Sequence, residues 1–156
     1  MIQWLNEKWF KNKDKLENYF RTHKQEEYSS YQDILRATIE NIINIDDYEW
    51  LNKTLDLSKI HVIDDGDYQG TLIFLIPRDG YQPDEDCYLV TFVNYGSCSG
   101  CDTLLNIQES WDIKNDEEYM GLPNTTQLHD YMTLALHLIE NARWLENLWG
   151  AKNENN

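Results

Sequence analysis

The sequence predicts an α+β fold, in which a three-stranded antiparallel meander is flanked by two N-terminal helices and a long C-terminal helix. Apolar residues recur at helical spacing near both ends of the chain, and three short apolar runs separated by turn residues lie between them. The connections between these runs are short, which favours an antiparallel order. With 156 residues the chain has the size of one domain. We expect residues 1–150 to form that domain and residues 151–156 to be a disordered tail.

Two helices are expected before residue 45. Residues 2–22 place apolar side chains at the spacing of an amphipathic helix. Ser29 or Ser30 would cap a second helix. An acidic run at residues 46–50 would open a short third helix, with its carboxylates at the positive end of the helix dipole. The second helix presents one apolar stripe, made of Ile34, Leu35, Thr38, Ile39, Ile42 and Ile43.

The three apolar runs that we expect to be strands are residues 60–63, 71–76 and 87–95. In a meander the first and third strands run in the same direction, so their ends lie at the same edge of the sheet. The turn at residues 64–70 should therefore lie beside the turn at residues 96–102. The two turns together become the candidate site.

Two further helices are expected after the strands. Asp102 should cap a short one. Asn124 and Gln127 have the spacing of a capping box, with the side chain of each accepting the backbone N–H of the other. The helix that they begin should run to about Trp149, because its apolar face continues that far and Gly150 would end it.

The chain is strongly acidic, with a formal net charge of −15 from 28 acidic and 13 basic residues. This charge repels phosphate backbones, so direct binding to nucleic acid or to an anionic membrane is not expected, whereas a basic protein surface would be attracted. No apolar run is long enough to span a membrane, and the N-terminus lacks the pattern of a secretory signal. Together with an odd count of 3 Cys, this predicts a cytoplasmic protein.

Cys98 and Cys101 form a C-x-x-C turn with two glycines, which would allow positive φ and bring both sulfurs to one side. Three interpretations stay open: reduced thiols that shape a strand-to-helix turn, two ligands of a zinc ion, and a redox dithiol. Zinc would need further ligands from nearby Asp or His residues. Acidic neighbours should raise the pKa of the thiols and oppose redox activity. Cys87 should lie toward the opposite edge of the sheet as a buried, small apolar residue.

No catalytic motif is present. The sequence has no Ser-His-Asp order, no H-E-x-x-H, no P-loop and no G-x-G-x-x-G after a strand. The 4 His are scattered along the chain, and we expect each to be a surface or packed imidazole. We therefore do not expect an enzyme, and no cofactor is expected apart from the zinc alternative.

Three blocks resemble those of a family of uncharacterised proteins from bacteriophages and prophages of Gram-positive bacteria. They are residues 95–104 (YGSCSGCDTL), 67–71 (DYQGT) and 131–138 (YMTLALHL), and the likeness spans about residues 15–145. The resemblance implies a phage accessory gene expressed in the cytoplasm of a bacterial host. It carries no activity and no catalytic residue. Small acidic proteins of that origin are often inhibitors of host or defence proteins, including anti-CRISPR and anti-restriction factors.

Charge and resemblance together predict a binding protein. It would dock on the basic nucleic-acid-binding groove of a host or defence protein, with carboxylates in place of phosphates. The candidate partner-binding residues are Asp46, Asp47, Glu49, Asp64, Asp65, Asp67, Asp84, Glu85, Asp86, Asp116, Glu117 and Glu118.

Two alternatives stay open beside this prediction. One is a zinc-binding or thiol-active protein that uses Cys98 and Cys101. The other is a structural or assembly protein, such as a homodimer, because tryptophans are more numerous than a core of this size needs and aromatic residues are enriched at interfaces. The tryptophans that suggest it are Trp4, Trp9, Trp111, Trp144 and Trp149.

Overall fold

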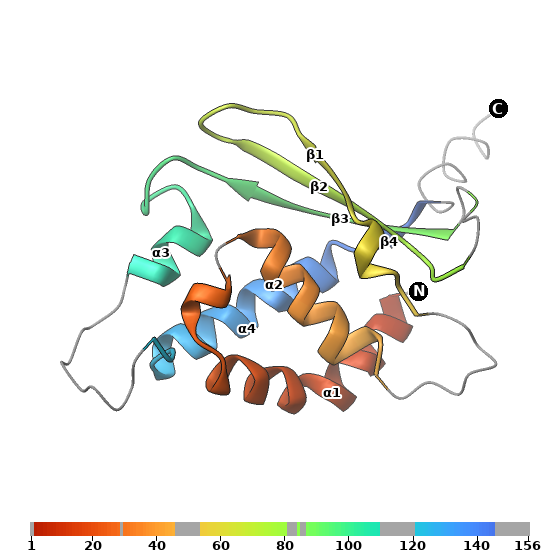
Figure 1. The fold of residues 1–156 in the computed structure, drawn as a ribbon, viewed down its shortest axis with the longest axis horizontal. Helices are drawn as coiled ribbons and strands as arrows, with labels where there is room; N and C mark the ends of the chain where they lie inside the picture. Colours follow the sequence, from red (N-terminus) through yellow and green to blue (C-terminus); the bar gives the residue numbers. More distant parts are fainter. Residues whose placement is uncertain are drawn as a thin grey trace.

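The computed structural model describes residues 2–28, 30–45, 54–80, 84, 87–109 and 121–145. These residues form a layer of helices that is covered on one side by a four-stranded antiparallel sheet (Figure 1). The strands follow one another across the sheet in chain order, and the buried apolar residues of helices and sheet form one cluster. The predicted α+β class is confirmed, but the meander has one strand more than the three predicted.

Some predictions fall on residues outside those that the structure describes. They concern the short helix at 46–50, the end of the domain near residue 150 and the tail at 151–156. Within the described ranges, no helix is both long enough and apolar enough to cross a membrane.

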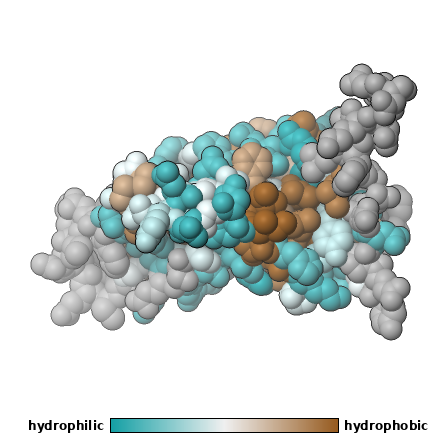
Figure 2. Space-filling model, turned by 90° about the horizontal axis from the view of Figure 1, so that it is seen from above, coloured by the Kyte–Doolittle hydropathy of each residue, from teal (hydrophilic) through white to brown (hydrophobic). Residues whose placement is uncertain are grey.

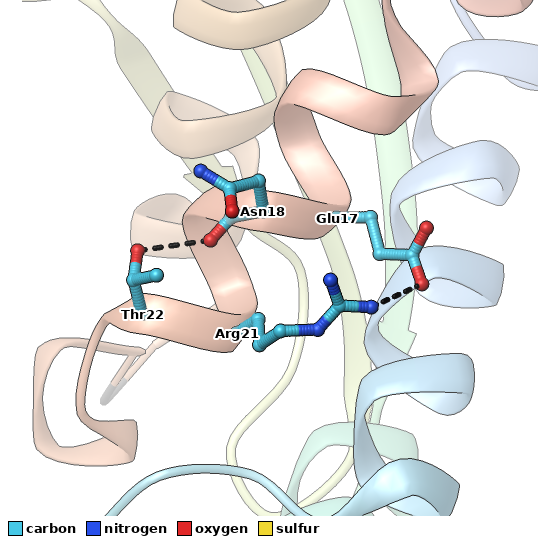
Figure 3. Close-up of polar contacts among 4 residues, drawn as sticks. All are labelled: Glu17, Asn18, Arg21 and Thr22. Carbon is cyan, nitrogen blue, oxygen red and sulfur yellow. Dashed lines mark hydrogen bonds and ion pairs between the residues drawn. The ribbon is translucent and has the colours of Figure 1, made fainter.

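The first predicted helix is confirmed as α1 (Ile2–Thr22). Near its end, Nη2 of Arg21 lies 3.0 Å from Oε1 of Glu17, one turn earlier (Figure 3). An exposed pair of this kind contributes about 0.3–0.5 kcal/mol. The hydroxyl of Thr22 donates to the carbonyl of Asn18 over 2.9 Å and satisfies one of the last helical carbonyls (Figure 3). The apolar side chains that α1 buries are Leu5, Trp9, Leu16 and Phe20.

A short 3-10 turn, η1 (Gln25–Tyr28), leads to α2 (Tyr31–Thr38). Of the two serines predicted as caps, Ser30 caps α2. Its hydroxyl accepts the N–H of Asp33 over 3.3 Å, and the carboxylate of Asp33 accepts the N–H of Ser30 over 3.1 Å. This reciprocal pair fixes where the helix begins.

The second helix continues as a π-helical turn, η2 (Ile39–Ile43), which the apolar stripe did not reveal. Side chains of α1 satisfy carbonyls at its end. Nδ2 of Asn12 donates to the carbonyl of Ile42 over 3.0 Å, and Nζ of Lys8 donates to that of Ile45 over 3.0 Å. Both side chains are buried, so these bonds hold α1 against the end of the second helix.

The sheet confirms the three predicted strands as β1 (His61–Asp64), β2 (Gly70–Pro77) and β3 (Tyr88–Tyr95). A 3-10 turn, η4 (Leu57–Lys59), precedes β1. β2 pairs with β1 on one side and with β3 on the other, antiparallel in both cases. β1 is an edge strand, and all four of its residues are exposed.

One face of the sheet packs on the helices, because alternate residues of a strand point to the same side. Phe74 and Ile76 of β2 are completely buried on this face. The buried hydroxyl of Thr91 donates to the carbonyl of Leu138 over 2.6 Å and ties β3 to α4 (Thr125–Glu140). α4 thereby supports the middle of the sheet.

Both helix starts predicted after the strands are confirmed. α3 (Thr103–Glu109) follows β3 directly after the cysteine turn. At the start of α4, Oδ1 of Asn124 accepts the N–H of Gln127 over 2.8 Å, and Oε1 of Gln127 accepts the N–H of Asn124 over 3.0 Å. The capping box is therefore formed as its spacing predicted.

The prediction that the last helix continues to about Trp149 is wrong. α4 ends at Glu140, and after a turn β4 (Arg143–Trp144) pairs with β3. The indole of Trp144 is 6 % exposed and stacks on Trp4, with 6.2 Å between ring centroids. Pairing the edge of β3 and burying this ring outweigh the helical pattern, which continues along the sequence.

Candidate functional site

The β1–β2 turn and the turn after β3 lie at the same end of the sheet (Figure 1). The hydroxyl of Tyr95, the last residue of β3, donates a hydrogen bond to Oδ1 of Asp64, the last residue of β1, over 2.6 Å. β2 lies between these two strands, so the bond spans it. The predicted proximity of the two turns is confirmed.

Three of the predicted partner-binding carboxylates, Asp64, Asp65 and Asp67, are exposed in the β1–β2 turn. Oδ1 of Asp64 also accepts the N–H of Gly66 over 3.0 Å, and Oδ1 of Asp65 accepts the N–H of Thr71 over 2.6 Å. The phenol hydrogen bond, followed by this N–H, holds the pKa of the Asp64 carboxyl below its usual range. Asp64 therefore carries its negative charge at neutral pH on a side chain that the fold already fixes.

The other predicted carboxylates are not brought to this turn by the described residues. Asp84 is exposed in the connection before β3, which is the opposite end of that strand. The remaining candidates lie outside the described residues, and they are Asp46, Asp47, Glu49, Glu85, Asp86, Asp116, Glu117 and Glu118.

Charge is unevenly distributed along the chain. Residues 1–24 contain 6 basic and 3 acidic residues, and residues 25–156 contain 7 basic and 25 acidic residues. Residues 60–109, which include β1 to α3, contain 9 acidic residues and one basic residue, Arg78. The guanidinium of Arg78 lies 4.4 Å over the ring of Trp144, at the other end of the sheet from the Asp64 turn. The end of the sheet that carries Asp64 is thus anionic, and residues 60–109 place no basic residue near it.

The buried carboxylate of Asp102 organises the turn after β3. Its Oδ1 accepts the N–H of Leu105 over 2.9 Å, which confirms it as the cap of α3. The hydroxyl of Tyr31 donates to the same oxygen over 2.9 Å, and the N–H of Gly96 donates to Oδ2 over 3.0 Å. The hydroxyl of Tyr31 in turn accepts the N–H of Leu104 over 3.0 Å. α2, β3 and α3 are thereby joined around one carboxylate.

The two thiols of the cysteine turn lie together and are exposed, with 2.7 Å between the Sγ atoms of Cys98 and Cys101. Sγ of Cys101 also accepts the N–H of Cys98 over 3.1 Å. The expected positive φ is not used at the glycines of this turn, since Gly121 is the positive-φ glycine of the described residues. Gly96 is needed for space instead, because a Cβ there would lie 2.5 Å from the carbonyl oxygen of Cys101.

The two thiols differ in acidity. The hydrogen bond from the Cys98 thiol, followed by the backbone N–H of Cys98, lowers the pKa of Cys101. The same thiol pair raises the pKa of Cys98. The expectation that acidic neighbours raise the pKa of both thiols is therefore wrong for Cys101. Cys101 is therefore the more acidic thiol of the pair.

The geometry offers little to a zinc ion beyond these two sulfurs. Within the described residues, no group of three or more His, Cys, Asp or Glu side chains is placed to hold a metal ion. Cys87 precedes β3 and is half-buried rather than buried as expected. Its distance in sequence along an extended strand keeps it away from the cysteine turn, as predicted.

Two cavities flank α3, and sequence reasoning identified neither. The first, of about 400 Å³, lies under the β1–β2 hairpin. Its lining comes from α2, both turns and α3, which are far apart in the sequence and share no motif. The lining residues used below are Tyr31, Asp64, Leu72, Tyr95, Leu104 and Leu105.

The second cavity, of about 390 Å³, lies between the cysteine turn, α3 and α4. Cys101 lines it together with Asp130 and His137, which are two turns apart on the same face of α4. His137 was expected to be a surface or packed imidazole, and it is exposed. A reactive thiol at Cys101 would therefore share a cavity with an imidazole.

The outer face of the sheet is apolar in its middle. The register places Ile63, Ile73 and Phe92 side by side on this face, with Ile63 51 % and Phe92 42 % exposed. Figure 2 looks onto the molecule from this side and shows hydrophobic residues gathered next to a hydrophilic region. The net charge of −15 on each chain opposes self-association through this face.

The tryptophans that suggested an interface are used inside the fold where the structure describes them. Trp9 is buried in α1, and Trp4 and Trp144 stack on each other. Trp111 and Trp149 lie outside the described residues. The count of tryptophans therefore supports the homodimer less than the sequence suggested.

No protein-family model matches this chain, and no curated protein or solved structure matches it either. The resemblance to bacteriophage and prophage proteins stays a prediction carried by the three sequence blocks. Function is therefore inferred from the geometry and charge of the chain's own residues.

Proposed function

We propose that this chain is a binding protein whose anionic β1–β2 turn docks on a basic, nucleic-acid-binding protein of a host or defence system. Docking there would exclude nucleic acid from that protein. The observation that carries the proposal is the β1–β2 turn, which exposes Asp64, Asp65 and Asp67 together. Grooves that bind phosphate backbones are lined with Lys and Arg, and carboxylates on a fixed scaffold satisfy the same cations.

Two properties of the turn favour binding. Hydrogen bonds from Tyr95, Gly66 and Thr71 fix the carboxylates of Asp64 and Asp65, so little side-chain entropy is lost when a partner docks. Residues 60–109 contain one basic residue, so little positive charge in this segment offsets the negative field of the turn. Long-range attraction of this kind raises association rates and weakens as salt is added.

The test is affinity capture from a bacterial host lysate, followed by competition. The chain should capture a basic nucleic-acid-binding protein at low salt, and both duplex DNA and high salt should release it. The triple variant Asp64→Asn, Asp65→Asn, Asp67→Asn should capture much less. A matched variant, Asp14→Asn, Asp79→Asn, Glu140→Gln, removes the same charge from exposed positions elsewhere and should capture as the wild type does. Equal loss in both variants, or capture that DNA does not displace, would contradict the proposal.

A second candidate, a thiol-active protein, is favoured by the 2.7 Å separation of the Cys98 and Cys101 sulfurs. Oxidation by diamide would join the two sulfurs, with both thiol protons and two electrons passing to the diamide. The expected result is a loss of two hydrogens in the intact mass, reversed by a dithiol reductant and absent in Cys98→Ser. Thiols that stay open to alkylation after diamide would exclude this candidate. Elemental analysis of the same sample would show whether zinc accompanies the chain.

A further inference from the structure

We propose that the cavity under the β1–β2 hairpin is an anchor site for an arginine side chain of the basic partner. The identity of the occupant as part of a partner protein rests on the proposed function, whereas the affinity for arginine follows from the cavity itself. The cavity is open to solvent, and its volume of about 400 Å³ is in the size range of small-ligand sites.

The walls of the cavity suit both the methylene chain and the guanidinium of an arginine side chain. Leu72 of β2 and Leu104 and Leu105 of α3 supply apolar surface. Long cationic side chains bury their methylene stems against such surface and keep the charged end near solvent. Tyr95, which is half-buried, also lines the cavity, and a planar guanidinium stacks on an aromatic ring better than an ammonium does.

The charge of the cavity selects a cation. Asp64 and Asp102 line it, and no Lys or Arg is among its lining residues. The carboxylate of Asp102 is already held by three donors, from Tyr31, Gly96 and Leu105. In Asp64, by contrast, both hydrogen bonds go to Oδ1, and Oδ2 accepts none from the described residues. Oδ2 of Asp64 is thus the acceptor left for an incoming guanidinium.

The cavity is formed before any ligand arrives. The bond from Tyr95 to Asp64, 2.6 Å long, holds the hairpin over the cavity, and the bonds around Asp102 hold the start of α3 beneath it. An arginine that enters does not have to order these walls. Preformed sites of this kind lose less free energy on binding than sites that must be assembled.

The experiment is a titration of the ¹⁵N-labelled protein with N-acetyl-arginine amide at constant ionic strength, followed by backbone amide shifts. The matched ligand is N-acetyl-citrulline amide, which has the same shape and no charge. Arginine amide should produce saturable shifts at Leu72, Leu104 and Leu105, and citrulline amide should not. Absence of saturable shifts at these residues, or equal shifts with citrulline amide, would overturn the proposal.

Two variants distinguish binding of arginine in the cavity from general attraction of a cation to the turn. Asp64→Asn keeps an acceptor for Tyr95 while removing the charge, and it should weaken binding of arginine amide about fivefold or more. Asp65→Asn removes the same charge from the same turn but outside the cavity lining, and it should have a much smaller effect. Equal weakening by both variants would show that the turn attracts arginine without an anchor site.

The outcomes for the two proposals are distinguishable. If arginine amide binds in the cavity but no basic protein is captured, the anchor site stands and the proposed function fails. If a basic protein is captured through the three carboxylates and arginine amide does not bind, the proposed function stands and the anchor site fails.

Discussion

The hydroxyl of Tyr31 donates a hydrogen bond to Oδ1 of Asp102 over 2.9 Å and joins residues that are 71 positions apart. The same hydroxyl accepts the N–H of Leu104, so one phenol completes both the cap of α3 and its first turn. Because Asp102 also holds Gly96, the geometry of the cysteine turn depends on this contact.

Removing this hydroxyl should cost stability. In Tyr31→Phe the buried carboxylate of Asp102 and the N–H of Leu104 each lose a partner, and the free energy of unfolding should fall by about 1–3 kcal/mol. Urea unfolding at neutral pH measures the change. The control is Tyr131→Phe, since the hydroxyl of Tyr131 is buried without a hydrogen-bond partner among the described residues. It should change stability little, and equal losses in the two variants would refute the role given to Tyr31.

The protein should lose stability in alkali, because the buried phenols of Tyr31 and Tyr131 resist losing their protons in the folded state. Burial, the largest cause in both, raises the pKa of Tyr31 to about 12 and that of Tyr131 to about 12. In the unfolded chain these groups lose their protons near about pH 10, so above that pH ionisation favours unfolding. Their contribution is complete below about pH 10 and is lost as the pH approaches 12. Urea midpoints across this range should decline, and the decline should be smaller in Tyr131→Phe.

Gly96→Ala should disturb the cysteine turn. The new Cβ would lie 2.5 Å from the carbonyl oxygen and 2.6 Å from Sγ of Cys101, so the backbone must shift. We expect a loss of about 1–3 kcal/mol in urea unfolding, the range for overpacked sites. Gly80→Ala meets nothing within 4 Å and should stay within about 0.5 kcal/mol of the wild type. A neutral Gly96→Ala would mean that the turn has room that the structure does not show.

Cys101 should be alkylated before Cys98. The thiolate is the nucleophile, and the pKa of Cys101 is lowered while that of Cys98 is raised. The pH at which iodoacetamide modification is half-maximal should therefore be lower for Cys101, as measured by peptide mass spectrometry. In Cys98→Ala the donor is lost, and the modification of Cys101 should shift to higher pH. Faster modification of Cys98 in the wild type would reverse the assignment.

The features predicted correctly from sequence were those set by neighbouring residues. The cap at Ser30, one of two serines that the sequence offered, and the capping box of Asn124 and Gln127 depend only on residues at the start of the helix. The proximity of Asp64 and Tyr95 followed from the direction of strands joined by short connections.

The features missed were those that only tertiary contacts decide. The helical pattern beyond Glu140 has no local stop, and β4 forms because the edge of β3 and the ring of Trp4 are available there. Asn12 and Lys8 look like ordinary polar residues of α1, yet they are buried and donate to carbonyls at the end of the second helix, 30 and 37 residues away. The two cavities arise in the same way, from residues that no short motif connects.

Within the described residues, α1 carries more basic than acidic residues, whereas the β1–β2 turn exposes three carboxylates, so charge is separated between these two parts. A cationic surface therefore exerts a torque on the molecule in addition to attracting it. Approach with the β1–β2 hairpin leading and α1 trailing would therefore be favoured. Most encounters then begin in one orientation, and the search for the docked arrangement is shortened before any contact is made.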